Sequence, residues 1–436
     1  MQHERQAAGM VRPDQGTLNI GARVFNFPRQ RTLWAGSVIM LVGSGFVSLS
    51  NFGYNIAVAH LLGPGDFGHA AAAVTLLMLA SCINLAFQLV TAKLIARNQD
   101  GGRATAYRAL RLQSWGVGVT LSLVLLVLSG SISAYLRLPT PHIIQVLALG
   151  MLFYIPLGVR RGGMQGTCRF FLLASNLSLE AVVKLVAAFV FIVYLNAGVM
   201  GAVGAIALSV CAAYFMPGGA PDLRDEPGPG RMASFSEGMQ AIIFFVGQVI
   251  INNVDILMVK HYFTAPEAGL YAAVALVGRL LYFATWSVTS AMFPVAAGVR
   301  VEKESRKTII VPLSFIVGLS AVFVSVLAAF PHLIIRILFG GGFHHAGLQM
   351  LLTMNAVATG TYALSVALIT YEMSRRIANT AWLQLAISIL LMAGIAGFHG
   401  SLLEVILVQQ ILRLALLLAV SIPFFVRRKA VVAEAA

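Results

Sequence analysis

Charged residues are scarce in this sequence. Only 11% of the 436 residues are charged, whereas 58% are apolar, and the mean hydropathy is +0.85. A water-soluble domain carries about 25% charged residues. The composition therefore excludes an ordinary soluble enzyme or binding domain and predicts that most of the chain lies in lipid.

Cysteine is equally scarce. Cys82, Cys168 and Cys211 are widely separated, and two of them fall in apolar runs. This spacing provides neither a disulfide framework nor a set of metal ligands, so we expect no metal and no other cofactor. Residues 1–31 lack the apolar core of a cleavable signal peptide. We therefore expect the first apolar run to direct membrane insertion.

Ten-residue segments of alternating polarity, which are typical of membrane β-barrels, are absent. Apolar runs of about 20 residues recur instead, and a helix needs that length to cross the hydrocarbon core. The predicted fold is an all-α integral membrane protein with about 12 transmembrane helices. The runs cover residues 33–60, 67–95, 114–136, 142–159, 171–195, 199–216, 234–260, 266–297, 309–330, 346–371, 378–398 and 401–426.

Basic residues predict the orientation. If the N-terminus is cytoplasmic, 24 of the 30 Lys and Arg residues lie in cytoplasmic segments and three lie in outer turns. The three outer residues are Arg137, Lys260 and Arg336. Such an imbalance predicts that both termini are cytoplasmic. The net charge of +14 is spread over these segments without a nucleic-acid-binding motif, so we expect contact with anionic lipid headgroups and no nucleic acid.

One turn occurs twice in the sequence. Residues 60–74 read "HLLGPGDFGHAAAAV" and residues 261–275 read "HYFTAPEAGLYAAVA", with Gly68 matching Gly269 at an offset of 201. In the second copy, Thr264 and Glu267 have the spacing of a capping box. Turn chemistry alone could produce this likeness. The offset also maps the first run onto the seventh and the second onto the eighth, however. With six spans in each half, this predicts two lobes related as a parallel repeat.

The domain boundaries follow from this repeat. A Pro- and Gly-rich stretch, "PGGAPDLRDEPGPGRMAS", separates the two halves and reads as a flexible tether. We predict a cytoplasmic N-terminal segment (1–32), an N-terminal six-helix lobe (33–216), a cytoplasmic linker (217–233), a C-terminal six-helix lobe (234–426) and a cytoplasmic tail (427–436).

Three stretches together resemble one family of transporters. They are "LLGPGDFG" after the first run, "RRGGMQGTCRF" (Arg160 to Phe170), and "NNVDILMVKHYFTAPEAGLYAAVALVGRL" (Asn252 to Leu280). With the span count and the duplication, the chain resembles the polysaccharide-transport (Wzx-type) branch of the multidrug/oligosaccharidyl-lipid/polysaccharide (MOP) exporter superfamily from Thr32 to Arg428. The individual motifs are loose, and their combination carries the resemblance.

The resemblance implies a function. Members of this family flip undecaprenyl-pyrophosphate-linked oligosaccharides across the bacterial cytoplasmic (inner) membrane for polysaccharide synthesis, by alternating access between two lobes. It implies a lipid-linked oligosaccharide as substrate, the lipid bilayer as surroundings, and polysaccharide polymerase and chain-length proteins as partners. The chain is then not an enzyme.

Three cations lie within predicted spans: Lys184, Arg279 and Arg413. A charged residue at mid-membrane costs about 2.5–3.5 kcal/mol on insertion scales, which favours a functional or paired role. Glu180 stands one helical turn before Lys184, and Asp255 lies across a hairpin from Arg279, so either carboxylate could form an ion pair or couple transport to an ion. The cations could equally contact the pyrophosphate of the substrate.

Arg413 is predicted to be the least neutralised of the three. Glu404 lies nine residues away, about 13 Å along a helix, so a direct pair is not expected. Gln409, Gln410 or backbone carbonyl groups could satisfy the guanidinium instead. A bidentate contact with a phosphate is the functional alternative.

Neutral amides form a second candidate group, because amides suit sugar hydroxyls as well as contacts between membrane helices. The candidate substrate-binding amides are Asn51, Asn55, Gln88 and Asn252. Basic residues near the inner ends of the second and fourth runs could recruit the pyrophosphate at a cytoplasmic entrance or anchor the helices at headgroup level. These entrance candidates are Lys93, Arg97, Arg160 and Arg161.

Other functions remain open. A cation-coupled multidrug exporter of the same superfamily would have an acidic, aromatic cavity, whereas this sequence has an excess of intramembrane cations. A membrane polysaccharide polymerase or ligase would need a large outer loop with catalytic carboxylates, and residues 331–345 contain none. A scaffold for polysaccharide enzymes would need no intramembrane charges. The flippase is therefore the leading hypothesis.

Overall fold

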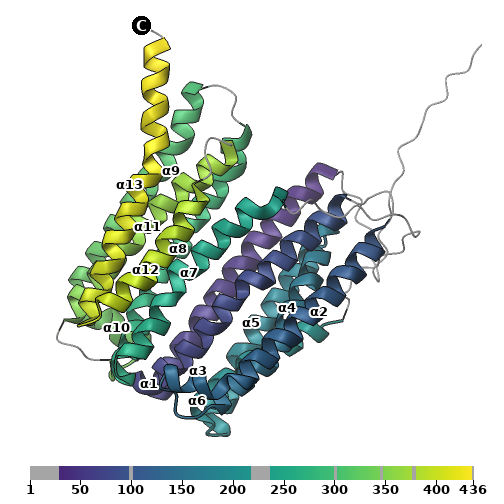
Figure 1. The fold of residues 1–436 in the computed structure, drawn as a ribbon, viewed down its shortest axis with the longest axis vertical. Helices are drawn as coiled ribbons and strands as arrows, with labels where there is room; N and C mark the ends of the chain where they lie inside the picture. The colour runs from purple at the N-terminus through teal and green to yellow at the C-terminus, as the bar shows by residue number, and fades with distance from the viewer. Residues whose placement is uncertain are drawn as a thin grey trace, which may run out of the picture.

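The computed structural model describes residues 29–97, 102–217, 236–298, 302–343, 347–375 and 380–434. These residues form helices joined by short turns (Figure 1). From residue 218 onward the predicted linker lies outside the described residues, as do residues 1–28 and 435–436 at the chain ends.

The helices agree with the predicted spans. In chain order they are α1 (Arg29–Arg97), α2 (Arg103–Val127), α3 (Ser129–Tyr135), α4 (His142–Gly166), α5 (Phe170–Phe189), the π-helical turn η1 (Val190–Tyr194), α6 (Gly198–Phe215), α7 (Ser236–Tyr262), α8 (Ala265–Gly298), α9 (Glu302–Ala329), α10 (Pro331–Phe339), α11 (Leu348–Arg375), α12 (Ala381–Gly397) and α13 (Leu402–Glu434).

Helix α1 contains two membrane crossings. Its backbone leaves the helical region at Gly63 (φ 72°, ψ 177°), and Pro64 opens the second half, where a missing N–H costs nothing. Ten of the described helices are long and apolar enough to span a membrane, and α12 adds a shorter apolar helix over Trp382–Gly397. With α1 counted on both sides of Gly63, each of the 12 predicted runs falls on one crossing, which confirms the predicted fold.

The helices form two lobes (Figure 1). The N-lobe comprises α1 to α6 and the C-lobe comprises α7 to α13, and α1 packs against α7 and α8 where the lobes meet. The short helices α3 and α10 occupy matching places, directly after α2 and α9. In Figure 1 the lobes converge at the end where α3 and α10 lie, and their helices diverge toward the other end.

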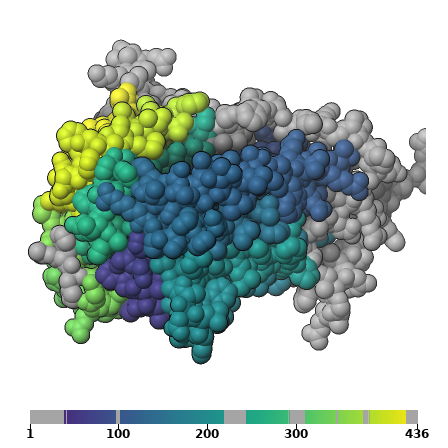
Figure 2. All heavy atoms as spheres, turned by 60° about the horizontal axis from the view of Figure 1, so that its bottom comes forward, coloured from purple at the N-terminus to yellow at the C-terminus, as the bar shows by residue number. Residues whose placement is uncertain are grey.

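The two copies of the repeated turn meet at the convergent end. A Cβ atom on Gly269 would lie 1.7 Å from the carbonyl oxygen of Pro64, and one on Gly68 would lie 2.7 Å from that of Ala265. Only glycine allows the backbones to approach so closely, as in other membrane helix pairs with small interface residues. We call the contact of residues 64–68 with residues 265–269 the seam. Figure 2 shows this end of the molecule, with the first half of α1 in purple between the lobes.

The repeated histidines strengthen the seam. His261 of the C-lobe stacks on Tyr135 of α3 with ring centroids 3.9 Å apart, and its Nδ1 atom lies 2.7 Å from the Tyr135 carbonyl oxygen. His60 of the N-lobe lies against Gly340 at the end of α10, where an added Cβ would be 3.3 Å from the imidazole. Each histidine therefore contacts the opposite lobe, so the duplicated turn closes the two lobes against each other.

The predicted capping box is confirmed at the second turn. The carboxylate of Glu267 accepts the backbone N–H of Thr264 (3.1 Å) and its hydroxyl (2.7 Å) at the start of α8. Gly63 and Pro64 bend the chain at the corresponding place in α1. The two turns thus use different local chemistry to reach equivalent positions.

The seam predicts a conformational effect of Gly269→Ala. A Cβ atom 1.7 Å from the Pro64 oxygen must move to about 3.5 Å, so the lobes should separate by roughly 2 Å or more at this end. Spin labels at Leu195 and Gly341, which lie at this end of the N-lobe and C-lobe, measure the separation by double electron–electron resonance. Gly53→Ala is the matched control, because a Cβ there meets nothing within 4 Å. An unchanged distance in Gly269→Ala would contradict the seam.

Candidate functional site

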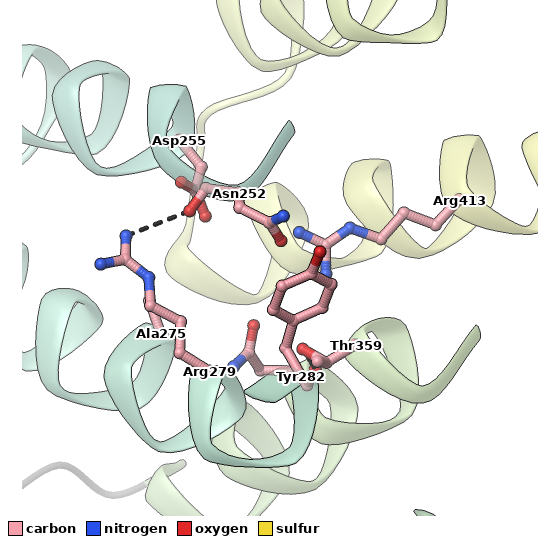
Figure 3. Close-up of a pocket in the computed structure, with 8 residues that line it drawn as sticks. Asn252, Asp255, Ala275, Arg279, Tyr282, Thr359 and Arg413 are labelled. Carbon is pink, nitrogen blue, oxygen red and sulfur yellow. Dashed lines mark hydrogen bonds between the residues drawn. The ribbon is translucent and has the colours of Figure 1, made fainter. Parts of the chain in front are cut away.

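The C-lobe contains a small polar pocket between four helices (Figure 3). Helices α7, α8, α11 and α13 supply its walls. The pocket is lined by Asn252, Asp255, Ala275, Arg279, Tyr282, Asn355, Thr359 and Arg413. The structure thereby brings together four predicted residues: Asn252, Asp255, Arg279 and Arg413.

Arg279 links α8 to α7 across the pocket. Its Nη2 atom donates a hydrogen bond to the backbone oxygen of Asn252 (3.0 Å), drawn dashed in Figure 3. The next residue back, Gly278, leaves space for α11, because a Cβ there would lie 2.4 Å from the amide nitrogen of Asn355. That amide donates to the Val274 oxygen (3.0 Å) and fixes α11 against α8. Glycine at position 278 therefore allows α11 to pack closely on α8 and form the pocket wall opposite α7.

Asp255 belongs to a hydrogen-bonded chain across three helices. Its Oδ2 atom accepts the hydroxyl of Tyr271 (2.7 Å), and the Tyr271 hydroxyl accepts the side-chain amide of Gln409 (2.5 Å). These hydrogen bonds connect α7 to α8 and α13. In place of a direct hydrogen bond to Asp255, Arg279 bonds the neighbouring backbone, close enough for the two charges to attract. The predicted pairing across the hairpin is thus electrostatic, and Tyr271 supplies the hydrogen bond to the carboxylate.

Arg413 is the cation with the weakest hydrogen bonding in the pocket. It is 3% exposed, its Nη2 atom is 3.4 Å from the Ile251 oxygen, and its guanidinium lies 5.5 Å from the ring centre of Tyr362. Within the described part of the chain, its Nε–H has no acceptor. Glu404 instead accepts the backbone N–H of Gly400 (2.6 Å) at the start of α13. Arg413 thus keeps donors for a ligand, and Figure 3 shows it facing Arg279 from the opposite side.

The remaining predicted cation, Lys184, lies in the N-lobe. Its ammonium donates to the side-chain oxygen of Asn51 and lies 5.3 Å from the ring centre of Tyr54. Glu180 forms its salt bridge with Arg161 (2.5 Å), which corrects the expected direct pair of Glu180 with Lys184, although these two charges are near enough to attract. The cause is geometric: Arg161 on α4 presents its guanidinium to α5 and also donates to Asn176 (2.8 Å).

This ion pair also corrects the prediction for Arg161. The residue is 5% exposed and fully engaged, so it holds α4 to α5 and does not line an entrance. Arg160 donates to the Met216 oxygen (2.9 Å) and lies 5.0 Å from the ring centre of Tyr214. Both arginines therefore act within the N-lobe packing.

The other candidates are distributed over the N-lobe. Asn55 donates to the Asn51 oxygen within α1 (2.8 Å), and Gln88 donates to Gln165 of α4 (3.1 Å). Lys93 also has interaction partners, whereas the side chain of Arg97 lies outside the described residues. The candidates thus form two groups, a pocket in the C-lobe and a set of packed polar contacts in the N-lobe.

Several residues in or beside the pocket were not predicted as site residues. Tyr271 lies in the second copy of the repeated turn. Gln409 precedes Arg413 by one helical turn, so the two side chains share one face of the helix. Asn355 and Thr359 are also one turn apart on α11. Their i, i+4 spacing was the available signal. Only the fold shows that these faces converge on Arg279.

The buried ion pair of the N-lobe predicts a large stability effect. Glu180→Ala would leave the Arg161 guanidinium buried without its carboxylate, which costs about 3–5 kcal/mol at comparable sites. We expect a clear drop in the thermal unfolding midpoint in detergent. The double variant Glu180→Leu with Arg161→Met should recover much of the loss. Glu404→Ala, which removes an exposed helix cap, is the control. Equal midpoints for Glu180→Ala and the control would contradict this role.

Comparison with solved structures identifies the fold. An inward-facing multidrug resistance MATE family transporter of the MOP superfamily matches with a TM-score of 0.73 at 14% identity, over 89% of this chain and 96% of that chain. The lipid II flippase MurJ in an inward closed conformation matches with a TM-score of 0.67 at 11% identity, over 89% and 87%. An outward-facing MATE transporter matches with 0.58 at 15% identity, over 92% and 96%.

Comparison by sequence identifies the family. No curated protein matches this chain. The sequence model of a family described as polysaccharide biosynthesis protein matches residues 57–348, which is more than half of the chain and includes both copies of the repeated turn. The chain, a multi-pass membrane protein with the fold of MOP superfamily transporters, therefore belongs to the polysaccharide biosynthesis protein family.

Proposed function

We propose that this protein is a flippase that translocates undecaprenyl-pyrophosphate-linked oligosaccharide across the bacterial cytoplasmic membrane. One observation carries the proposal: the C-lobe pocket holds two arginines, of which Arg413 is buried, against one carboxylate. A pyrophosphate cannot cross hydrocarbon without compensation of its charge. The family match to polysaccharide biosynthesis and the fold of a lipid-linked-substrate transporter support this substrate class.

The hydrogen-bond donors of the pocket suit a phosphate. Arg413 offers an Nε–H without an acceptor among the described residues, and a guanidinium can hold two phosphate oxygens at once. Arg279 faces it across the pocket (Figure 3). Asp255 is occupied by the hydroxyl of Tyr271, which reduces its repulsion of an anion. The site therefore favours an anionic group over a cationic drug.

The small size of the pocket limits which part of the substrate it could bind. The pocket is narrow in this conformation, so it excludes an oligosaccharide and would have to widen to admit a pyrophosphate. The glycan would then extend into the space between the lobes, and the prenyl chain would remain in lipid. Asn51, Asn55 and Gln88 of the N-lobe would provide amides for the sugars, and Lys184 a further positive charge.

Alternating access would follow from the two-lobed architecture. The seam closes the convergent end, so the substrate would enter from the end where the helices diverge (Figure 1). The positive-inside pattern of the sequence supports a cytoplasmic location for that end and for both termini. Rocking of the lobes, with boundaries near 33–216 and 234–426, would then open the seam and close the opposite end.

A cation-coupled multidrug exporter is the second candidate, favoured by the structural match to a MATE transporter. In that case Asp255 would be the coupling residue. The two functions differ in the sign of the charge that the pocket binds.

The test is leaflet translocation of a radiolabelled undecaprenyl-pyrophosphate oligosaccharide in proteoliposomes. We expect Arg413→Ala and Arg279→Ala to lower the rate about tenfold or more, because a hydrogen bond to a charged group contributes about 1.5–3 kcal/mol. Arg413→Lys, which keeps the charge and loses the planar fork, should be intermediate. Arg336→Ala on α10 is the matched control, since this arginine is exposed and outside the pocket.

Three outcomes separate the hypotheses. Transport by the wild type and the control, with loss in the folded pocket variants, supports the flippase. Export of cationic dyes that depends on Asp255, without movement of the glycan lipid, supports the drug exporter. Equal rates for Arg413→Ala, Arg279→Ala and the control would contradict the role of the pocket.

A further inference from the structure

A buried lysine that the C-lobe pocket does not use lies beside the seam. Lys260 lies in the last turn of α7 and is 1% exposed. The described part of the chain gives its ammonium neither a hydrogen bond nor a salt bridge. Lysine is almost never fully buried without a partner, because an uncompensated buried charge is costly. The seam therefore closes over a cation at a free-energy cost.

Positive charge and unused donors gather around Lys260 from the opposite lobe. Arg137 follows α3, and His69 lies on α1; both are near enough for their charges to repel Lys260. The Nδ1 atom of His69 is buried and lacks a partner among the described residues. Two carboxylates are nearby: Asp66 is exposed and acts on His69, and Glu267 is occupied by Thr264. Among the described residues, neither of these carboxylates is bonded to Lys260.

The repeat shows that packing does not require this cluster. At the offset of 201, Lys260 corresponds to Ala59 and His69 corresponds to Leu270. Ala59 is 0% exposed and Leu270 is 4% exposed, so the equivalent side of the seam is closed by apolar residues alone. The two sides share the glycine contact and the histidine contacts, and they differ at these two positions. Lys260 and His69 are thus additions to a seam that closes without them.

We propose that Lys260, with His69 and Arg137, forms a phosphate-binding site between the lobes that is available when the seam opens. The anion is the pyrophosphate of the transported lipid on its way out of the C-lobe pocket, an identity that rests on the proposed function. The phosphate of a membrane lipid headgroup is the other source of the same chemistry. Once the anion leaves, closure buries Lys260 again.

The site also biases the conformational equilibrium. Partial desolvation of the unpaired ammonium and its repulsion by Arg137 destabilise the closed seam, and an anion that binds only the open seam stabilises the open form by mass action. Both effects favour opening while phosphate is present. Lys260 thereby links the presence of the substrate headgroup to the opening of the exit.

The test measures seam opening directly in full-length protein. Spin labels at Leu195 and Gly341 are introduced after replacement of Cys82, Cys168 and Cys211 by serine, and the protein is placed in nanodiscs of zwitterionic lipid. Leu195 is 65% exposed and a side chain at Gly341 meets nothing within 4 Å, so labels at both positions are tolerated. Inorganic pyrophosphate is the probe, and potassium chloride at equal ionic strength is the control.

The variants copy the other half of the repeat. Lys260→Ala and His69→Leu introduce the residues found at the equivalent positions, and Lys260→Arg keeps the charge. Lys260→Ala removes a buried charge, so we expect it to fold. In the wild type, pyrophosphate should raise the open population roughly fivefold or more, the lower end of ordinary coupling between a ligand and a conformation. Lys260→Ala should abolish this response, His69→Leu should weaken it and Lys260→Arg should retain it.

The outcomes distinguish the site from the proposed function. An equal response to pyrophosphate and chloride in the wild type overturns the site, as does a full response in Lys260→Ala. A response in the wild type that depends on Lys260, in a protein that moves no lipid-linked glycan, supports the site and rejects the flippase. If anionic phosphatidylglycerol in the nanodisc opens the seam through Lys260 without added pyrophosphate, the headgroup is the source of the phosphate.

Discussion

The close approach of two backbones at Gly68 and Gly269 is the constraint on which the arrangement of the lobes depends. Any side chain at Gly269 would overlap the carbonyl group of Pro64, so the lobes can meet here only through glycine. Because both turns come from one duplicated sequence, each lobe presents the same backbone surface to the other. The histidines at the start of each turn extend the contact to α3 and α10. The contact also buries side chains, because Phe67 packs against Phe339 and Phe343 of the opposite lobe, so opening of the seam must separate these rings.

The chemistry of the protein lies where the two halves differ. Asp255 and Arg279 in the C-lobe correspond to Tyr54 and Met78 in the N-lobe, and Tyr54 instead donates to the backbone of Ala202 within its own lobe (3.0 Å). The C-lobe thus forms a charged pocket, while the N-lobe ties its charges into packing through Arg161 and Glu180. The duplication supplies the mechanical framework, and divergence within it supplies the binding chemistry.

Much of the fold could be predicted from the sequence. The length of each apolar run and the repeated turn are local features, and the thickness of the lipid bilayer fixes the length that a spanning helix needs. The site was harder to predict. Lys184 lies one turn from Glu180, yet Glu180 pairs with Arg161 across α4 and α5, since contacts between helices depend on rotations that spacing does not give. Arg413 was correctly separated from Glu404, but its neighbours Tyr362 and Ile251 come from helices distant in sequence. The role of Tyr271 could not be predicted, because its hydroxyl donates to Asp255 on a neighbouring helix.

The central claim is that the pocket between Arg279 and Arg413 holds the pyrophosphate of a lipid-linked glycan. The most direct measurement is a cryo-electron microscopy structure of the protein with undecaprenyl-pyrophosphate oligosaccharide bound. The account predicts phosphate density within hydrogen-bonding distance of both guanidinium groups, with the glycan directed between the lobes. Phosphate density beside Lys184 in the N-lobe, with the C-lobe pocket empty, would contradict it.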